Sequence, residues 1–164
     1  MVDDEAPRPP GWIPDRPISY DPVAGTLAAL RATVTTLPAL LRGVSEAGAR
    51  SAPDGEWSIL QVVSHLVDAE NRYFERTRRM RTEERPHLPF YPDDDYSSLG
   101  LAEAVAHFRR LREAHVELLA ELRPEEWQRV GVHALAGEIS IRSQAVTTVA
   151  HDAEHLGQIA RRLP

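Results

Sequence analysis

Apolar residues recur at intervals of three and four along four long stretches of the chain, which is the pattern of amphipathic helices. These stretches cover residues 22–44, 58–81, 101–122 and 141–162. Pro38 lies inside the first stretch, and we expect it to kink or break that helix near Leu37. No segment shows a convincing alternation of apolar and polar residues. The pattern therefore predicts an all-α fold, an antiparallel up-down four-helix bundle.

Two of these helices begin with capping sequences. Ser58 and Gln61 form the pattern S-x-x-Q, in which each side chain bonds the backbone N–H of the other residue. Ser140 is placed to cap the last helix, because its hydroxyl can accept a hydrogen bond from an N–H group of the first turn.

The segments between the helices are expected to lack long regular elements. Residues 48–55 and the proline-rich acidic stretch 86–98 indicate loops, and PEEWQ (124–128) indicates a short turn opened by a proline. The stretch VGVHALAGEIS (130–140) indicates irregular chain with some extended structure.

The beginning of the chain differs from the rest in composition. Five of the 13 prolines fall within residues 1–19, which excludes a helix there. We therefore expect an extended proline-rich arm over residues 1–20 and a single bundle domain over residues 21–164, with no internal repeat.

Composition and charge limit the classes of partner. The net charge of −6 argues against nucleic acid and against an anionic membrane surface, because both attract basic proteins. The acidic start does not resemble a signal peptide, and no apolar run approaches the roughly 18 residues of a membrane span. We expect a cytoplasmic protein that acts on a small molecule. Cysteine is absent, so any metal ion must be held by nitrogen and oxygen ligands.

Three histidines fall on the edges of the apolar helix faces. His151 and His155 lie one turn apart on one flank of the last helix, and His65 lies on a flank of the second long helix. Three imidazoles with open coordination positions are the usual design of a catalytic metal site. A lone histidine near an apolar face is more often a hydrogen-bonded core residue, and spacing alone does not place His65 opposite the pair.

The other histidines are weaker candidates. His115 lies at the centre of the third apolar stripe, where it could be a fourth ligand but is better explained as a hydrogen-bonded core residue. His87, His107 and His133 are interpreted as surface or loop residues. The segment HDAEH fits the inverted zinc-protease motif H-x-x-E-H, but the carboxylate ligand that this chemistry needs downstream is missing from residues 156–164.

Three segments together resemble a known family. EWSILQVVSHLVDAENRYFERTRRM carries a tryptophan, a cap and a histidine at Trp57, Ser58 and His65. LPFYPDDDYSS resembles the acidic-aromatic loop that follows in many members. RPEEWQRVGVH and AHDAEHLGQI resemble the last third of the DinB-like superfamily, which ends in H-x-x-x-H-x-x-Q-I. The resemblance covers about residues 21–163 and leaves the arm outside.

The resemblance implies an up-down four-helix bundle in which three histidines bind one divalent metal ion. Carried over by position, the ligands are His65, His151 and His155. Members are often homodimers. Characterised relatives include bacillithiol and mycothiol S-transferases and maleylpyruvate isomerases, while many others are described as metal-dependent hydrolases.

Three functions are compatible with such a site. The first, which the resemblance favours, is a transferase of a low-molecular-weight thiol; a metal ion would lower the pKa of a thiol bound to it. The second is a hydrolase in which the metal activates water, with Asp68 or Asp152 as the base or as a residue that supports the ligands. The third is a metal-binding protein without catalysis. Imidazole ligands favour nickel or zinc over magnesium or calcium.

Overall fold

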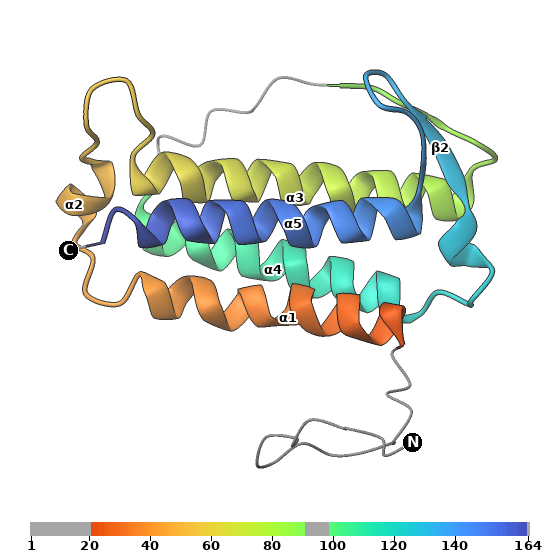
Figure 1. Ribbon diagram of the computed structural model, residues 1–164, viewed down its shortest axis with the longest axis horizontal. Coiled ribbons are helices and arrows are strands. Elements are labelled where there is room, and N and C mark those ends of the chain that lie inside the picture. The colour runs from red at the N-terminus through yellow and green to blue at the C-terminus, as the bar shows by residue number, and fades with distance from the viewer. Residues whose placement is uncertain (1–20, 91–98, 164) are drawn as a thin grey trace, which may run out of the picture.

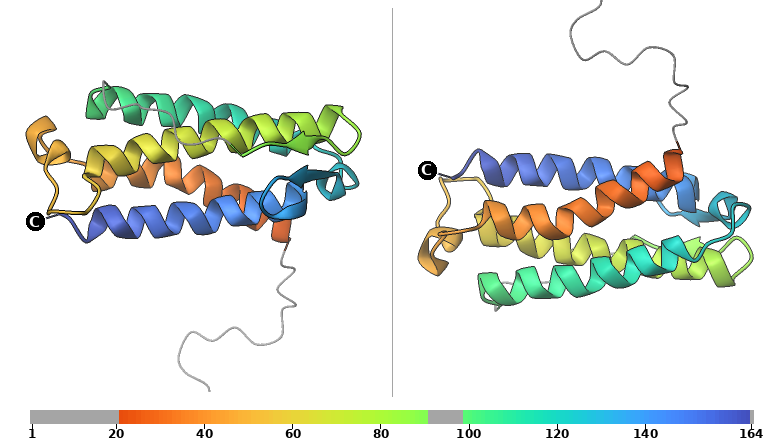
Figure 2. Two further views of the ribbon diagram at one scale, coloured as in Figure 1. Left: turned by 90° about the horizontal axis from the view of Figure 1, so that it is seen from above. Right: turned by 90° about the horizontal axis from the view of Figure 1, so that it is seen from below.

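Four long helices form a bundle in the computed structural model, which describes residues 21–90 and 99–163 (Figure 1). They are α1 (Pro22–Leu40), α3 (Ile59–Thr82), α4 (Leu101–Ala120) and α5 (Ile141–Ala160). Helices α4 and α5 each pack against both α1 and α3, so α1 and α3 occupy opposite corners of the bundle (Figure 2). This confirms the predicted four-helix bundle. The predicted arm, residues 1–20, and residues 91–98 lie outside the described residues.

The direction of the helices alternates except at one connection. Helices α3 and α4 run the same way, as the pairs Glu70–Arg112 and Arg81–Glu121 show, whereas α5 runs antiparallel to α3. The connection from residue 83 to residue 100 makes this possible. Eighteen extended residues reach roughly 60 Å, whereas the 24 residues of α3 rise only about 36 Å. The chain can therefore return along the bundle before α4 begins.

The predicted helix starts are confirmed by their capping hydrogen bonds. Ser58 and Gln61 form the complete capping box of α3, and Ser140 caps α5 through the N–H of Ser143. Helix α1 ends at Leu40 rather than at residue 44, with Pro38 in its last turn. Pro38 lacks one N–H of the helical ladder, but the helix continues past it and the N–H of Leu41 still bonds the carbonyl of Leu37, so the predicted break near Leu37 does not occur.

Short elements occupy segments that were expected to be loops. Helix α2 (Glu46–Arg50) lies partly within the predicted loop 48–55, where Ser45 caps it. A small sheet also forms at the end of the bundle. Its strands are β1 (His87–Leu88), β2 (Val130–His133) and β3 (Gly137–Ser140), and the 3₁₀ helix η1 (Glu126–Gln128) precedes β2. Strands β2 and β3 lie in the stretch 130–140 that was expected to hold some extended structure, and η1 lies in the turn expected at 124–128. Helix α2 and strand β1 were not predicted, because elements of two to five residues are too short to show a hydrophobic period.

The sheet closes over the ends of α3 and α4. Strand β2 pairs parallel with β1 and antiparallel with β3. Gly131 lies in β2 directly under Leu88 and Met80, and a Cβ atom there would come within 2.6 Å of Leu88 Cδ1. Glycine is required at this position because the strand approaches α3 and β1 so closely.

A buried polar layer separates two hydrophobic clusters in the bundle. One cluster contains Leu66 and Phe108, and the other contains Met80 and Leu119. Between them lie the buried polar side chains Thr33, Glu70, Thr77, Arg112, His115, Gln144 and Asp152. Each of the four long helices contributes to this layer, and one of its members, Asp152, directly follows His151 in α5.

Helix α1 is the most apolar long helix of the described residues. Its mean hydropathy of 1.3 over 18 residues makes it, by length and composition alone, the single described helix that could cross a membrane. In the structure α1 packs on α4 and α5, with Leu30 and Leu37 fully buried. A core helix of a bundle has the same composition, so the value does not by itself indicate a membrane span.

Candidate metal centre

The fold brings together the three histidines singled out in the sequence. His65 projects from α3, and His151 and His155 project from the facing side of α5. The ring centroids lie 5.1 Å apart for His65 and His151, 4.8 Å for His65 and His155, and 4.4 Å for His151 and His155. All three side chains are half-buried. Among the residues that the structure describes, these three form the one group placed to hold a metal ion.

The spacing of the ring nitrogens fits a divalent metal ion. One nitrogen from each imidazole lies within 4.8 Å of the others, and Nε2 of His65 lies 3.0 Å from Nε2 of His151. Two nitrogens bound to one tetrahedral zinc ion at 2.0–2.1 Å would lie about 3.4 Å apart. Small side-chain adjustments therefore convert this cluster into a coordination site.

Electrostatics keep one of these imidazoles neutral. Burial, together with the neighbouring His155 and His65, lowers the pKa of His151 to about 4. A neutral imidazole has a lone pair available for a metal ion at neutral pH. His151 can therefore bind a metal ion at neutral pH without first losing a proton.

Gln158 orients one member of the cluster. Its Oε1 lies 2.9 Å from Nδ1 of His155, one turn further along α5. With Oε1 as the acceptor, the imidazole carries its proton on Nδ1 and leaves Nε2 free as a ligand. Such outer hydrogen bonds commonly fix the tautomer of metal-binding histidines.

Two aromatic rings border the cluster. The indole of Trp57 lies 5.1 Å from the ring of His65 and is nearly parallel to that of His155, at 6.4 Å. Trp57 is 41% exposed, so it forms a wall that solvent and ligands can reach. On the other side, the ring of Tyr73 meets His151 edge-on at 5.8 Å.

The two carboxylates considered as bases, Asp68 and Asp152, are each held in an ion pair with an arginine. Asp68 is fully buried and forms an ion pair with Arg72, one turn further along α3. Asp152 faces the core, where it accepts hydrogen bonds from Arg112 and from Thr33 Oγ1. Asp152 is therefore buried, but its partners belong to the polar layer rather than to the histidine cluster.

His115 belongs to the polar layer and not to the cluster. Its Nδ1 lies 2.8 Å from Glu70 Oε1 and its Nε2 lies 2.9 Å from Thr77 Oγ1. Gln144 donates to the same hydroxyl of Thr77, so that hydroxyl can donate to His115. The imidazole then accepts at Nε2 and donates from Nδ1 to the carboxylate of Glu70. The interpretation of His115 as a hydrogen-bonded core residue agrees with this geometry.

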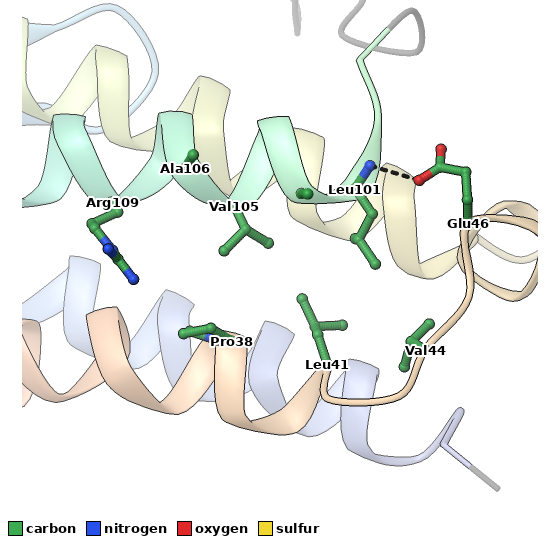
Figure 3. Close-up of a pocket in the computed structure, with 9 residues that line it drawn as sticks. Pro38, Leu41, Val44, Glu46, Leu101, Val105, Ala106 and Arg109 are labelled. Carbon is green, nitrogen blue, oxygen red and sulfur yellow. Dashed lines mark hydrogen bonds between the residues drawn. The ribbon is translucent and has the colours of Figure 1, made fainter.

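An open pocket lies between α1 and α4, on the edge of the bundle opposite to the histidine cluster (Figure 3). Its volume is about 530 Å³, and Val105 and Arg109 project into it from α4 toward Pro38 of α1. The carboxylate of Glu46 at one end accepts a hydrogen bond from the backbone N–H of Leu101. The pocket shares no residue with the histidine cluster and contains no group of metal-ligating side chains.

Sequence reasoning did not assign site roles to Trp57, Tyr73 and Gln158. Gln158 could have been found from its spacing, because a residue three positions after a helical ligand lies on the same face. The positions of Trp57 and Tyr73 depend on how α3 faces α5, which no local pattern reveals. Arg112 was missed because a charged residue beside an apolar stripe is usually solvated.

Solved structures with the same architecture are known. One, from Bacillus subtilis, is described as "YfiT … a probable metal-dependent hydrolase with an unusual four-helix bundle topology"; it is 21% identical, with a TM-score of 0.80 over 92% of this chain and 91% of that chain. TT2238, "a four-helix bundle protein", is 25% identical, with a TM-score of 0.65 over 85% of this chain and 98% of that chain. A DinB-like protein of Bacillus subtilis (YjoA) is 12% identical, with a TM-score of 0.61 over 82% and 86%.

The fold and the cluster define a four-helix bundle protein with a three-histidine site. The profile of the DinB superfamily matches residues 29–159. The chain belongs to the DinB superfamily, which confirms the resemblance seen in its motifs.

Two curated relatives come from Oceanobacillus iheyensis. They are named "Putative metal-dependent hydrolase OB0413" and "Putative metal-dependent hydrolase OB0782". Each is 26% identical to this chain, over 111 residues (65% of this chain) and 110 residues (64%) respectively. The match covers 64% of each relative, so the chain spans just under two thirds of their length.

Proposed function

We propose that the protein is a metal-dependent enzyme in which His65, His151 and His155 hold one divalent ion, nickel or zinc. The observation that supports this most strongly is the convergence of three half-buried imidazoles from two helices. Three protein ligands leave coordination positions for a reactant, which is typical of catalytic sites. Imidazole nitrogen suits nickel and zinc better than magnesium or calcium.

The reaction that we favour is the transfer of a low-molecular-weight thiol to an electrophile. A bound divalent ion supplies the nucleophile at neutral pH by lowering the pKa of the thiol. The two carboxylates considered as bases, Asp68 and Asp152, are held in ion pairs. Thiol transfer needs no protein base to form its nucleophile, so it suits this arrangement. The chain has no cysteine, so the sulfur would come from the co-substrate.

The second candidate is hydrolysis of an ester or amide through activated water. The names of the two Oceanobacillus iheyensis relatives favour it. In this case Trp57 and Tyr73 would border the substrate, and proton transfer would have to involve solvent rather than Asp68 or Asp152. A homodimeric assembly and a cytoplasmic location remain predictions of the sequence.

Three measurements on protein purified without a histidine tag test the proposal. Elemental analysis should find about one nickel or zinc ion per chain, and H65A protein should lose it; an H65A protein that keeps full metal would remove His65 from the site. The metal-loaded protein should consume a thiol in the presence of an electrophile from a panel of alkylating agents and epoxides. Turnover of esters or amides instead would favour the hydrolase, and inactivity in both assays would favour a metal-binding protein without catalysis.

A further inference from the structure

Arg76 is a half-buried cation that lies along α3 from the histidine cluster. It follows Tyr73 by one turn, and the ring of Tyr73 meets His151 edge-on at 5.8 Å. Within residues 21–90 and 99–163, its guanidinium has one hydrogen bond, a long one of 3.4 Å to the backbone carbonyl of Pro89. A guanidinium carries five donors, so this contact leaves most of them available.

The charge of Arg76 has no carboxylate partner within that part of the chain. Neighbouring Arg72 is neutralised by Asp68 in a buried ion pair. Burial lowers the pKa of Arg76, and the positive charge of Arg72 lowers it further. Partial burial of an uncompensated cation is costly, so proteins seldom keep one without a ligand or partner.

The groups around Arg76 are donors as well. His133 accepts two backbone hydrogen bonds at Nδ1 from the turn that follows it, so its neutral ring carries the proton on Nε2. Burial lowers the pKa of His133, and Arg76 is close enough to lower it further. Arg76 also lowers the pKa of the Tyr73 hydroxyl, against the larger effect of burial. A cationic fork beside a phenol and a neutral imidazole is a suitable environment for an anion.

The position of Tyr73 is fixed relative to the cluster. Gln144 of α5 donates a hydrogen bond of 2.9 Å to the backbone carbonyl of Tyr73, which ties α3 to α5 at this level. Along α3, Tyr73 therefore lies between Arg76, three residues further on, and the histidine cluster, where its ring contacts His151. A molecule bound at the cluster can extend past Tyr73 toward Arg76.

We propose that Arg76 binds the carboxylate of a small-molecule thiol whose sulfur reacts at the histidine cluster. The planar fork of arginine matches a carboxylate through two parallel hydrogen bonds. The chain carries a net charge of −6, so an anionic substrate needs a local cation to be bound. The identity of the reacting end rests on the proposed function, whereas the anion position rests on the surroundings of Arg76.

The first test compares thiols that differ only at the far end. Cobalt-loaded protein is titrated with mercaptocarboxylates of three to eleven carbons and with the mercaptoalcohols of equal length, and the thiolate-to-cobalt absorption is followed. We expect at least one chain length at which the carboxylate binds about 10-fold more tightly than the alcohol. R76Q should abolish this preference without changing the cobalt content or the affinity for the alcohol, and R76K should retain part of it. R78Q on the exposed face of α3 is the matched control and should behave as wild type.

The second test uses no thiol and no metal. Chelator-treated, ¹⁵N-labelled protein is titrated with hexanoate and with hexanol, and the Nε–H signal of Arg76 and the backbone signal of His133 are followed. Hexanoate should shift both signals, hexanol should not, and R76Q should lose the response at His133. If this test succeeds and no thiol binds the cobalt protein, the anion position stands and the thiol-transfer function fails. If hexanoate shifts neither signal, or if R76Q retains the preference for mercaptocarboxylates, the assignment of Arg76 is overturned.

A further variant separates a substrate role from pairing within the chain. Asp93, Asp94 and Asp95 lie outside the described residues. Like a substrate carboxylate, their side chains could form an ion pair with Arg76. If Arg76 serves only to pair with these aspartates, R76Q and the triple variant D93N/D94N/D95N should lower the melting temperature equally. In that case added hexanoate should bind neither variant, nor the wild type. That outcome would also overturn the proposal. A hexanoate response retained in the triple variant would support it.

Discussion

Glu70 shows how one buried carboxylate can remain charged in the core of the bundle. Burial alone would raise the pKa of Glu70, but the hydrogen bond from His115 and the charge of Arg112 outweigh burial and bring it to about 2. The folded pKa thus lies below the unfolded value of about 4.3. The stabilisation is therefore present above that value and is lost as the pH falls toward 2.

We expect this carboxylate to contribute about 3 kcal/mol to the pH dependence of unfolding between pH 5 and pH 2. Urea unfolding of metal-free protein at several pH values measures it. E70Q should be less stable at neutral pH and should lose this part of the acid dependence. E75Q, which changes an exposed carboxylate on the same helix, should retain it; an equal loss in E75Q would contradict the role assigned to Glu70.

Trp57 should report the arrival of a metal ion directly. Its indole lies 5.1 Å from the ring of His65, a distance at which a paramagnetic ion quenches fluorescence efficiently. Addition of one equivalent of Ni²⁺ or Cu²⁺ should therefore reduce the emission of W12F/W127F protein, in which Trp57 is the one remaining tryptophan. W57F protein should bind the same amount of metal with little quenching. Quenching of equal size in W57F would mean that the ion binds elsewhere.

At the scale of elements, a metal ion at the cluster would fasten α5 to α3. An ion that binds only the folded state stabilises it by roughly 3–4 kcal/mol at 100 to 1,000 times its Kd. A chelator should therefore lower the melting temperature at neutral pH. The effect should shrink near pH 5, because protons compete with the metal below the ordinary histidine value of about 6.5.

Variants of single histidines locate the ion in this experiment. H151A and H155A should each abolish the sensitivity to chelator. H115A should lower the melting temperature, because it breaks the contacts to Glu70 and Thr77, but should retain the sensitivity. If H115A alone abolished it, the ion would be bound at α4. If a chelator left the melting temperature of a metal-loaded protein unchanged at every pH, the bundle would be preformed and the ion would serve chemistry alone.

The elements that the sequence predicted are those whose signals are local. The apolar period of α3 and its capping box at Ser58 specify that helix without reference to the rest of the chain. The direction of α4 relative to α3 depends on how residues 83–100 run, and the strands β1 to β3 are too short for a period. The same limit applies to the site. The spacing of His151 and His155 is local, whereas their approach to His65 and Trp57 requires the packing of α5 on α3.

At the scale of the whole molecule, the polar layer defines how the four helices face one another. Arg112 of α4 bridges Glu70 of α3 and Asp152 of α5, and Thr33 of α1 joins Asp152. Buried ion pairs add little net stability, but they penalise any packing that leaves one member unpaired. The layer therefore favours a single rotation of α5 about its axis, the one that turns His151 and His155 toward α3.

If the polar layer has this role, removing one of its charged side chains should destabilise the fold more than replacing all three with apolar ones. R112M should destabilise the fold by about 3–5 kcal/mol, because it leaves two buried carboxylates without a partner. The triple variant E70L/R112M/D152L should recover much of that loss in urea unfolding. It should nevertheless bind metal more weakly than wild type, because α5 is no longer held in one orientation. A triple variant with unchanged metal affinity would show that the layer does not position the ligands.

The distribution of the ligands along the chain also has a consequence for the order of synthesis. His65 leaves the ribosome before its partners in the cluster, which follow 86 and 90 residues later in α5. A nascent chain that ends before residue 151 holds one of the three imidazoles and lacks the carboxylate of Asp152. We therefore expect that nascent chains do not bind free metal ions at this site. The ion would be acquired only after α5 has been synthesised and has packed against α3.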